Sequence, residues 1–494
     1  MPVFLIKFNR HKPVLRGKVA GAEPCARCLG CYTNEPLCEA YRRVPQMSVN
    51  KIPYTFIAKS GPDVARSPPC VITLSKISRF TKRMAEGHLM KNKKILNDPV
   101  YGFVGIPYGI IFNLVEHPYF QRLRRIKQTS LTHLVYPGAL HTRFHHALGA
   151  LHLVQQAIEV LRSKDVHITQ EEAEGVCIAI LLHDIGHGPF SHTLEHTLMH
   201  VTHEDLSLYF MEELNEAFGG RLELAMSIFK DVYPKPFLHQ LVSGQLDMDR
   251  MDYLNRDSFF TGVHEGVIGY DRIIKMLAVR DGELVVEEKG IYSIEKFLIA
   301  RRIMYWQVYL HKTVLSAEQM MIVALNRAKD LVKKGEAVEA PPALNFFLRG
   351  APVAADFERD RSALLQRFAA LDDYDVMTAF KYWQHHSDKV LAYLSQCLIN
   401  RRLFRLEFSY EPFEVGYLER VKQAVLDWSE LDHGALDYLF IQGEEANAAY
   451  RKSKDEIKIL RKNGQVRPMS ESTDYDIQSK SVRKYYICYP KIKF

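Results

Sequence analysis

Hydrophobic residues recur at helical spacing along most of the chain after residue 90. Between residues 147 and 161 the apolar positions share one helical face, made of Leu148, Leu151, Val154, Ile158 and Leu161. The same period predicts further helices over residues 118–127, 171–184, 204–217, 295–335, 361–371, 375–398 and 415–428. We therefore expect a mainly α fold with a helical C-terminal region.

Three segments depart from this period and predict small β additions. Val104–Phe112 contains a β-branched run. Leu277–Lys289 places Asp281-Gly282 between apolar residues, as a hairpin turn does. The charged tail beyond residue 450 becomes rich in tyrosine at 483–490 (RKYYICYP), which predicts a terminal strand.

The first 89 residues differ in composition from the rest. They hold 15 Lys and Arg against 5 Asp and Glu, a charge of +10, whereas the remaining residues sum to −3. The positive net charge of the chain, +7, therefore comes from this segment. Their four closely spaced cysteines (C-x2-C-x2-C-x6-C) suit zinc or an iron–sulfur cluster, at Cys25, Cys28, Cys31 and Cys38. We favour a disordered extension or a misassigned start, because no second pair completes a zinc framework. The expected division is 1–89, a catalytic domain over 90–330, and a helical region with a charged tail over 331–494.

The sequence contains no signal for a membrane. Its apolar runs fall well short of the roughly 20 residues that a spanning helix needs. The first residues, MPVFLIKFNRHK, lack the features of a secretory signal. We expect a cytoplasmic protein without a membrane partner.

The candidate chemistry is concentrated in residues 178–192, IAILLHDIGHGPFSH. His183 and Asp184 end an apolar helical run, and such a pair is costly to bury without a partner. With His146 and Asp249 they form two imidazoles and two carboxylates, which suit one divalent metal and leave positions open for water and phosphate. A lone histidine beside an apolar face is usually a core residue, so the set carries the prediction. These ligand types accept Mg, Mn, Fe or Zn, and the sequence does not choose between them.

Cationic and proton-carrying groups accompany this set. Arginines and a lysine suited to a polyphosphate lie within or near the same motifs, at Arg143, Arg250, Arg301, Arg302 and Lys312. Groups that can carry a proton near neutral pH are His187, His192, His203 and Glu204.

Residues 95–320 resemble the deoxynucleoside triphosphate triphosphohydrolases of the HD superfamily. The matching stretches occur in the family's order: ILNDPVYG at 95–102, FQRLRRIKQ at 120–128, VYPGALHTRFHHALG at 135–149, LLHDIGHGPFSHTLEH at 181–196, THED at 202–205, DMDRMDYLNRD at 247–257 and RRIMYWQVYLHK at 301–312. The resemblance implies an HD-domain helical phosphohydrolase core. It also implies metal-dependent attack of water on the α-phosphate of a dNTP, which releases a deoxynucleoside and inorganic triphosphate.

The resemblance also assigns roles to individual residues. His192 would be the acid for the leaving oxygen, with His187, His203 and Glu204 near the α-phosphate. The residues that would bind the substrate are Arg143, Arg250 and Arg301 on the triphosphate, Gln128 and Asp257 on the 3′-hydroxyl, and Tyr253 and Tyr309 against the sugar.

Family members also assemble as oligomers, and several are activated by nucleotides. The activator-site pattern of these relatives matches Asn97, Gln121 and Arg124. Glu116 occupies the position at which a relative has an aspartate that recognises guanine. A polar helix face at an oligomer contact is the alternative for Gln121 and Arg124. We expect a homo-oligomer whose main partner is the dNTP substrate.

Two other functions remain open from the sequence. One is an HD phosphohydrolase that acts on a nucleoside monophosphate or a signalling nucleotide. The other is a non-catalytic nucleotide- or nucleic-acid-binding protein that uses the basic first segment and the Lys/Arg-rich tail, whose phosphate contacts would give salt-dependent binding.

Overall fold

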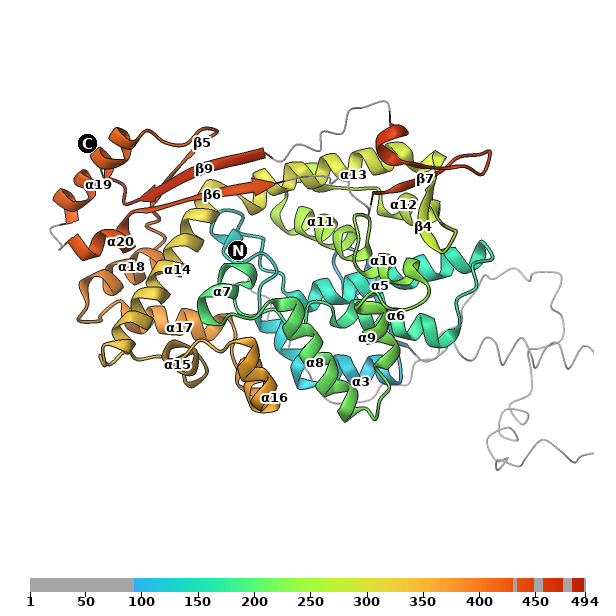
Figure 1. The fold of residues 1–494 in the computed structure, drawn as a ribbon, viewed down its shortest axis with the longest axis horizontal. Coiled ribbons are helices and arrows are strands. Elements are labelled where there is room, and N and C mark those ends of the chain that lie inside the picture. The colour runs from blue at the N-terminus through green and yellow to red at the C-terminus, as the bar shows by residue number, and fades with distance from the viewer. Residues whose placement is uncertain (1–92, 430–432, 448–455, 474–481, 493–494) are drawn as a thin grey trace, which may run out of the picture. The chain divides into compact units, whose positions relative to one another are not determined.

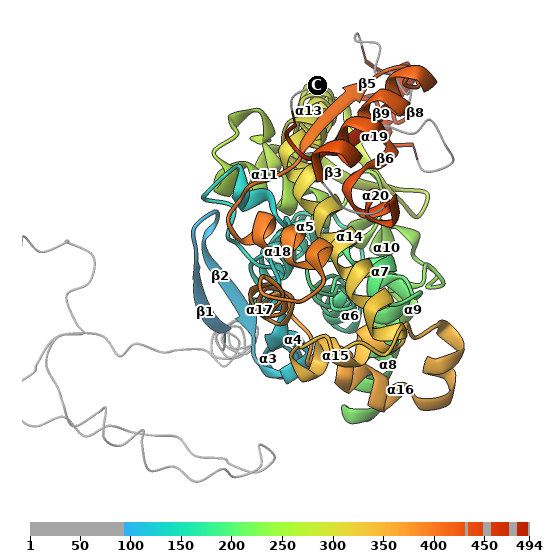
Figure 2. The same cartoon turned by 90° about the vertical axis from the view of Figure 1, so that its left-hand side faces the viewer.

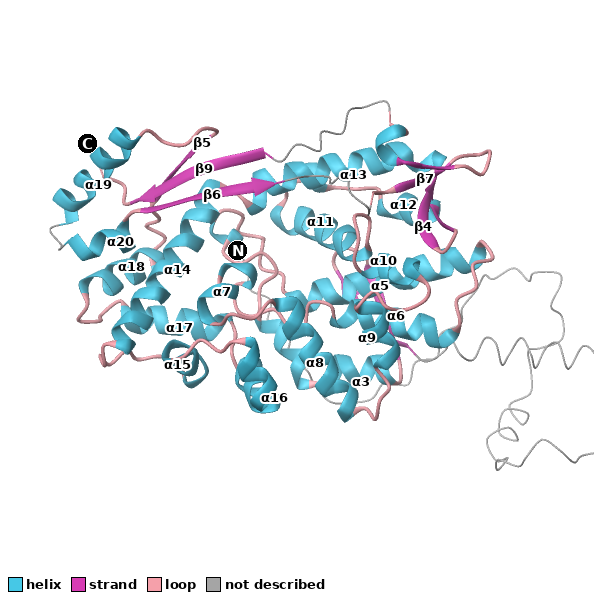
Figure 3. Ribbon diagram, viewed as in Figure 1, coloured by secondary structure: helices cyan, strands magenta, loops and turns pink. Residues whose placement is uncertain are grey.

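The computed structural model describes residues 93–429, 433–447, 456–473 and 482–492. The segment 1–89 and its cysteines lie outside the described residues. Helices dominate the described chain, which confirms the mainly α prediction (Figure 3). None of its described helices is both long and apolar enough to cross a membrane.

The described chain begins with an antiparallel hairpin (Figure 2). Strand β1 (Lys93–Asp98) pairs with β2 (Gly102–Pro107), and Asp98 closes the turn by accepting hydrogen bonds from the backbone N–H groups of Val100 and Tyr101. The hairpin predicted within residues 104–112 is present but lies earlier. After Gly109, whose φ is 100°, the chain enters helix α3 (Ile110–Glu116).

Three helices form the centre of the core (Figure 1). Helix α5 (Arg143–Ser163) packs against both α6 (Gln170–Leu182) and α11 (Met248–Thr261). Residues 175–182 of α6 are all buried, which explains why this segment is apolar around its whole circumference. Its start is fixed by a capping box, in which the Thr169 and Glu172 side chains each accept the other's backbone N–H.

Further helices surround this centre. Their bounds are α4 (Pro118–Gln121), a 3-10 helix (Arg122–Arg125), α7 (Glu195–Leu198), α8 (His203–Ala217), α9 (Glu223–Phe229), α10 (Pro236–Val242) and α12 (Tyr270–Met276). The hairpin predicted around Asp281-Gly282 is confirmed as β3 (Leu277–Arg280) and β4 (Glu283–Glu287). Both turn residues have positive φ, 52° and 80°, as a tight hairpin turn requires.

Two of the predicted long helices are interrupted. The segment predicted as 295–335 consists of α13 (Ile291–Met304), a π-helical turn (Tyr305–Tyr309) and α14 (Lys312–Lys333). The segment predicted as 375–398 divides into α17 (Asp373–Trp383) and α18 (Lys389–Ile399). Asp388 starts α18 by accepting the backbone N–H of Leu391, so a new helix begins where periodicity alone predicted continuation.

The C-terminal region is helical, as predicted, but it also contains strands. Its helices include α15 (Pro342–Arg349), α16 (Ala354–Ala369), α19 (Val415–Ser429) and α20 (Leu436–Leu439). The predicted terminal strand is confirmed as β9 (Val482–Tyr489), the centre of an antiparallel sheet with β5 (Arg405–Ser409) and β6 (Ile441–Asn447). Strands β7 (Lys458–Leu460) and β8 (Val466–Pro468) extend the β3–β4 sheet.

Candidate active site

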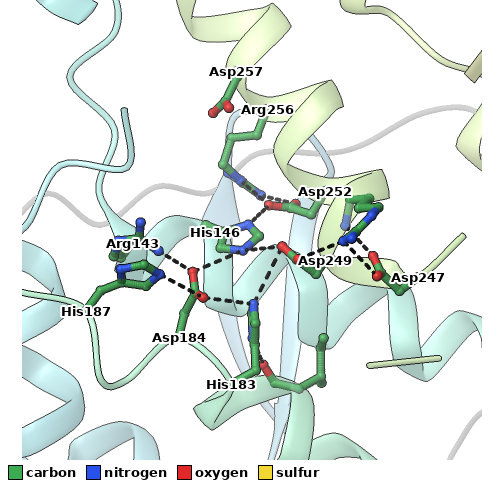
Figure 4. A network of polar contacts seen from close by, with 12 residues as sticks. Arg143, His146, His183, Asp184, His187, Asp247, Asp249, Asp252, Arg256 and Asp257 are labelled. Carbon is green, nitrogen blue, oxygen red and sulfur yellow. Dashed lines mark hydrogen bonds and ion pairs between the residues drawn. The ribbon is translucent and has the colours of Figure 1, made fainter. Parts of the chain in front are cut away.

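Three helices bring the four predicted metal ligands together (Figure 4). His146 lies in the first turn of α5, His183 and Asp184 directly follow α6, and Asp249 lies in the first turn of α11. Asp249 Oδ1 is 3.1 Å from His146 Nε2 and 3.5 Å from His183 Nε2. Asp184 Oδ1 is 3.4 Å from His183 Nε2. Residues more than 100 positions apart in the chain therefore meet at one point.

The two imidazoles are oriented as metal ligands. His146 Nδ1 lies 2.7 Å from Asp252 Oδ2, and His183 Nδ1 lies 2.6 Å from the carbonyl oxygen of Ile180. Because those oxygens accept hydrogen bonds, the proton of each ring in its neutral form lies on Nδ1, and Nε2 then presents its lone pair. Both Nε2 atoms are buried without a well-aligned hydrogen bond among the described residues. Two such nitrogens beside carboxylates fit a divalent metal ion.

The charges of this set are strongly coupled. Burial works against the charge of His146, but the neighbouring carboxylates of Asp249 and Asp252 outweigh it and raise its pKa to about 10. Burial also opposes the charge of Asp249, yet the adjacent rings of His146 and His183 hold the pKa of that carboxyl well below its usual range. A cation that binds here displaces protons from the rings, so its binding releases protons.

A buried network supports His146 from behind. Arg256 holds both oxygens of Asp252, at 2.9 and 3.0 Å, and reaches Asp98 at 2.8 Å. Gly149 of α5 makes room for this network, since a Cβ atom there would lie 2.0 Å from Asp252 Oδ1. Sequence reasoning missed Asp252 and Arg256, although their spacing of three and seven residues from Asp249 places all three on one side of α11.

Arg143 and His187, which were predicted to act on the triphosphate and near the α-phosphate, lie beside Asp184. Arg143 forms an ion pair with Asp184, and its Nε donates to Ser191 Oγ at 2.9 Å. His187 Nε2 is 3.4 Å from Asp184 Oδ1, and the His187 ring stacks on that of His203 at 4.0 Å. Gly186 allows this approach, because a Cβ atom there would meet the backbone at the start of α8.

His203 has an acidic partner that the sequence did not reveal. Its Nδ1 lies 2.7 Å from Glu195 and 3.3 Å from the predicted Glu204. Glu195 lies within the stretch 181–196, but only the turn between α7 and α8 places it beside His203. The side chain of His192 lies outside what the structure describes, so its role as the acid stays a prediction.

A cavity of about 480 Å³ adjoins the metal set, which is a volume typical of small-molecule sites. Arg143 and Arg250 connect the two, since Arg143 pairs with Asp184 and an Arg250 nitrogen lies 3.8 Å from Asp249. All seven predicted substrate-binding residues line this cavity: Gln128, Arg143, Arg250, Tyr253, Asp257, Arg301 and Tyr309. The structure thus brings them together, while their roles stay predictions.

Tyrosines form one wall of the cavity. The Tyr309 ring meets those of Tyr253 and Tyr305 edge-on, at 6.2 and 5.4 Å. The Tyr309 hydroxyl donates to Asp257 at 2.6 Å, and His141 lies 2.6 Å from the other oxygen of Asp257. These contacts hold the Tyr309 ring in place. His141 was not predicted, although it lies in the quoted motif at 135–149.

The predicted activator residues do not line the cavity. Gln121 accepts from Arg124 Nε at 2.8 Å and donates to the carbonyl oxygen of Val115 at 2.7 Å. Asn97 and Glu116 are exposed, on β1 and at the end of α3. Their role in binding an activator stays a prediction.

Comparisons with known proteins agree with this geometry. Residues 143–257 match the family model of the HD domain, and residues 268–339 match that of the HD associated region. The chain is 30% identical over 422 residues to the uncharacterized protein YwfO of Bacillus subtilis, covering 81% of this chain and 93% of that protein. It is 31% identical over 271 residues to the deoxynucleoside triphosphate triphosphohydrolase SAMHD1 homolog of Dictyostelium discoideum, covering 51% of this chain and 52% of that protein.

A solved structure also indicates similarity to a phosphohydrolase. The crystal structure of the phosphohydrolase BT4208 from Bacteroides thetaiotaomicron matches with a TM-score of 0.78 and 50% identity, over 81% of this chain and all of that one. The helical core and its histidine–aspartate set define a phosphohydrolase fold. The chain belongs to the HD-domain phosphohydrolase family.

Proposed function

We propose that this protein hydrolyses deoxynucleoside triphosphates to a deoxynucleoside and inorganic triphosphate. The observation that carries the proposal is one cavity, beside the metal set, that is lined by three arginines and a tyrosine wall. A phosphomonoester substrate would need fewer cations. The relationship to the Dictyostelium protein, which is named a deoxynucleoside triphosphate triphosphohydrolase, supports the same substrate class.

His146, His183, Asp184 and Asp249 would hold the metal. When bound there, a divalent ion would supply an activated water and neutralise charge on the phosphate. The protein's own part is to keep both histidines in the ligating tautomer, through Asp252 and the carbonyl oxygen of Ile180.

The arginines would orient the triphosphate. The Nε atoms of Arg250 and Arg301 are buried without a hydrogen-bond partner among the described residues, so each retains a donor for a ligand. Arg143 already faces Asp184, which positions it near the phosphate next to the metal. Guanidinium groups suit this task because they donate two parallel hydrogen bonds to a phosphate.

Proton transfer to the leaving 5′-oxygen would come from the histidine side of the site. His192 is the predicted acid. Glu195 and Glu204 beside His203 fix the orientation of that ring. We extend the proposal to a homo-oligomer in which Asn97, Glu116, Gln121 and Arg124 bind an activating nucleotide.

The decisive experiment is product analysis with the full chain. We expect Mn²⁺ or Mg²⁺ and each dNTP, singly and mixed, to give a deoxynucleoside and intact triphosphate on anion-exchange chromatography. Turnover only in the mixture would support activator binding. Asp249→Ala should abolish turnover, because it removes a ligand, while Asp271→Ala, at an exposed position of α12, should not.

Other products would contradict the proposal. A monophosphate with pyrophosphate would place the attack on another phosphorus atom. Hydrolysis of monophosphates alone would indicate another HD substrate. Absence of any turnover, with the Asp249→Ala variant behaving identically, would favour a binding protein.

A further inference from the structure

The cavity has a second chemical character away from the metal. Arg143 and Arg250 lie beside Asp184 and Asp249, at the cationic end. Two glutamates also line the cavity, Glu318 from α14 and Glu445 from β6. Neither belongs to a motif that the sequence analysis singled out, and the proposed hydrolysis uses neither.

The two carboxyl groups form one local environment. Burial, with the negative charge of Glu445 acting in the same direction, raises the pKa of Glu318 to about 7, although hydrogen bonds with the hydroxyls of Ser130 and Thr193 work against the rise. Burial also raises the pKa of Glu445. The charge acting on Glu318 is thus that of another acid, which distinguishes this acidic end from the cationic end.

A buried hydroxyl group without a hydrogen-bond partner in the described part of the chain lies at the acidic end of the cavity. Thr129 lines the cavity and is only 8% exposed, and its Oγ1 has no hydrogen-bond partner among the described residues. It directly precedes Ser130, whose hydroxyl lies 3.0 Å from that of Thr193. Leaving a buried polar group unpaired is unfavourable, so a ligand that pairs with Thr129 is favoured here.

We propose that Glu318 and Glu445 form the nucleobase end of the cavity and select guanine, by accepting hydrogen bonds from its N1–H and 2-amino groups. This inference rests on the proposed function only in taking a nucleotide as the ligand. It goes further because Glu445 comes from the C-terminal sheet, beyond the matched family regions, which end at residue 339.

The hydrogen-bonding pattern of the bases argues for guanine. Guanine alone presents two adjacent N–H donors on its Watson–Crick edge, which match the two oxygens of one ionised carboxylate. These two hydrogen bonds stabilise the charged form of the glutamate, which burial alone disfavours. Adenine and cytosine each place an acceptor beside their amino group, so one oxygen would face a lone pair. Thymine places carbonyl oxygens on both sides of its single N–H, which a pair of acids disfavours most.

The test combines turnover with binding. For the full chain and for Glu318→Gln and Glu445→Gln, kcat/KM would be measured with each dNTP, and affinity would be measured by calorimetry with each dNTP in EDTA. We expect the preference for dGTP over dATP to fall about tenfold or more in Glu318→Gln, because the amide opposes one guanine N–H and leaves it unpaired. Glu445→Gln should also lower the preference for dGTP over dATP.

Glu444→Gln is the matched control. Glu444 is the preceding residue of β6, points to the opposite face of the strand and pairs with Arg483 at 3.2 Å. Glu444→Gln removes the same charge as the two test substitutions and should leave the preference for dGTP over dATP unchanged. A preference for dGTP that survives in Glu318→Gln, or its absence from the unaltered protein in both assays, would overturn the inference.

The binding assay separates this inference from the proposed function. If the protein hydrolyses no dNTP but binds dGTP in EDTA with a preference that Glu318→Gln removes, hydrolysis fails and the base site stands. If it hydrolyses all four dNTPs with ratios that both variants leave unchanged, hydrolysis stands and the base site fails.

Discussion

At the scale of single residues, the site depends on side chains that touch no substrate. Asp252 holds the Nδ1–H of His146, and Arg256 in turn holds Asp252 through two hydrogen bonds. Partners of this kind fix both the tautomer and the direction of a ligating ring. Asp252 and Arg256 are buried, so each also contributes to the stability of the fold.

Asp252→Asn should weaken metal binding. The amide matches the carboxylate in size, but it lacks the charge that keeps the His146 proton on Nδ1. We expect Mn²⁺ affinity, measured by calorimetry, to fall about 10- to 100-fold. Asp271→Asn is the control, and an unchanged affinity in a folded Asp252→Asn protein would contradict the role assigned to Asp252.

Tyr309 is expected to distinguish deoxyribose from ribose. Its ring is held by Asp257 and by two neighbouring tyrosines, so it cannot easily move aside for a 2′-hydroxyl. In Tyr309→Ala, the ratio of kcat/KM for dGTP to that for GTP should fall by up to about a hundredfold. Tyr292→Ala, at an exposed position of α13, should keep the ratio. Equal ratios in both variants would mean that another group excludes the hydroxyl.

At the scale of elements, interruptions in the helices position the cavity. Arg301, Tyr305 and Tyr309 recur every four residues through the end of α13 and the π-helical turn, and all three line the cavity. The chain then restarts as α14, which supplies Glu318. A continuous helix over 295–335 would not give this change of direction.

The start of α18 offers a pH-dependent test of helix capping. Burial opposes the charge of Asp388, but hydrogen bonds from Arg327 and from the Leu391 N–H outweigh it and lower its pKa. A lowered pKa stabilises the fold above the unfolded value, near pH 4, and this contribution disappears as the pH falls through the folded value. Asp388→Ala should therefore cost about 1–2 kcal/mol in the free energy of unfolding at pH 7.

The same variant should lose its disadvantage in acid. Urea unfolding followed by circular dichroism at pH 7 and pH 3 would measure both differences. Asp437→Ala, at an exposed position of α20, should have little effect at either pH. A cost for Asp388→Ala that is equal at both pH values would show that the charge of Asp388 does not stabilise the helix start.

At the scale of the whole molecule, the C-terminal region holds the active-site loop in place. Phe190 and Ser191 have positive φ values of 52° and 53°, a strained conformation for residues other than glycine. Asp373 of α17 accepts the backbone N–H groups of Phe190 and Lys127, both at 2.9 Å. The Ser191 hydroxyl then meets Arg143. Residues beyond 330 therefore help to shape the loop that follows His183 and Asp184.

Asp373→Ala should lower both stability and turnover. It leaves two backbone N–H groups without their acceptor, each worth about 1–3 kcal/mol if buried. We expect a lower melting temperature, and a larger loss of kcat/KM than of Mn²⁺ affinity, because the loop and Arg143 move while the metal ligands remain. Tyr374→Ala, the exposed neighbour, should change neither. Normal turnover in a folded Asp373→Ala protein would refute this coupling.

The sequence by itself determined the family and the helical core, and it predicted a metal set whose four residues the structure brings together. The segment 178–192 combines an apolar run with an adjacent histidine and aspartate, and that local pattern is readable without a structure. The hairpin at Asp281-Gly282 and the terminal strand at 483–490 were likewise predictable, because turn geometry and β propensity act over a few residues.

The tertiary structure alone decided which distant groups support and complete the site. Asp252 and Glu195 acquire roles only when packing places them against His146 and His203. Glu445 reaches the cavity because β6 pairs with β9, a contact between segments about 40 residues apart. Short strands and single buried acids leave little periodic signal, since their placement depends on long-range packing rather than on neighbouring residues.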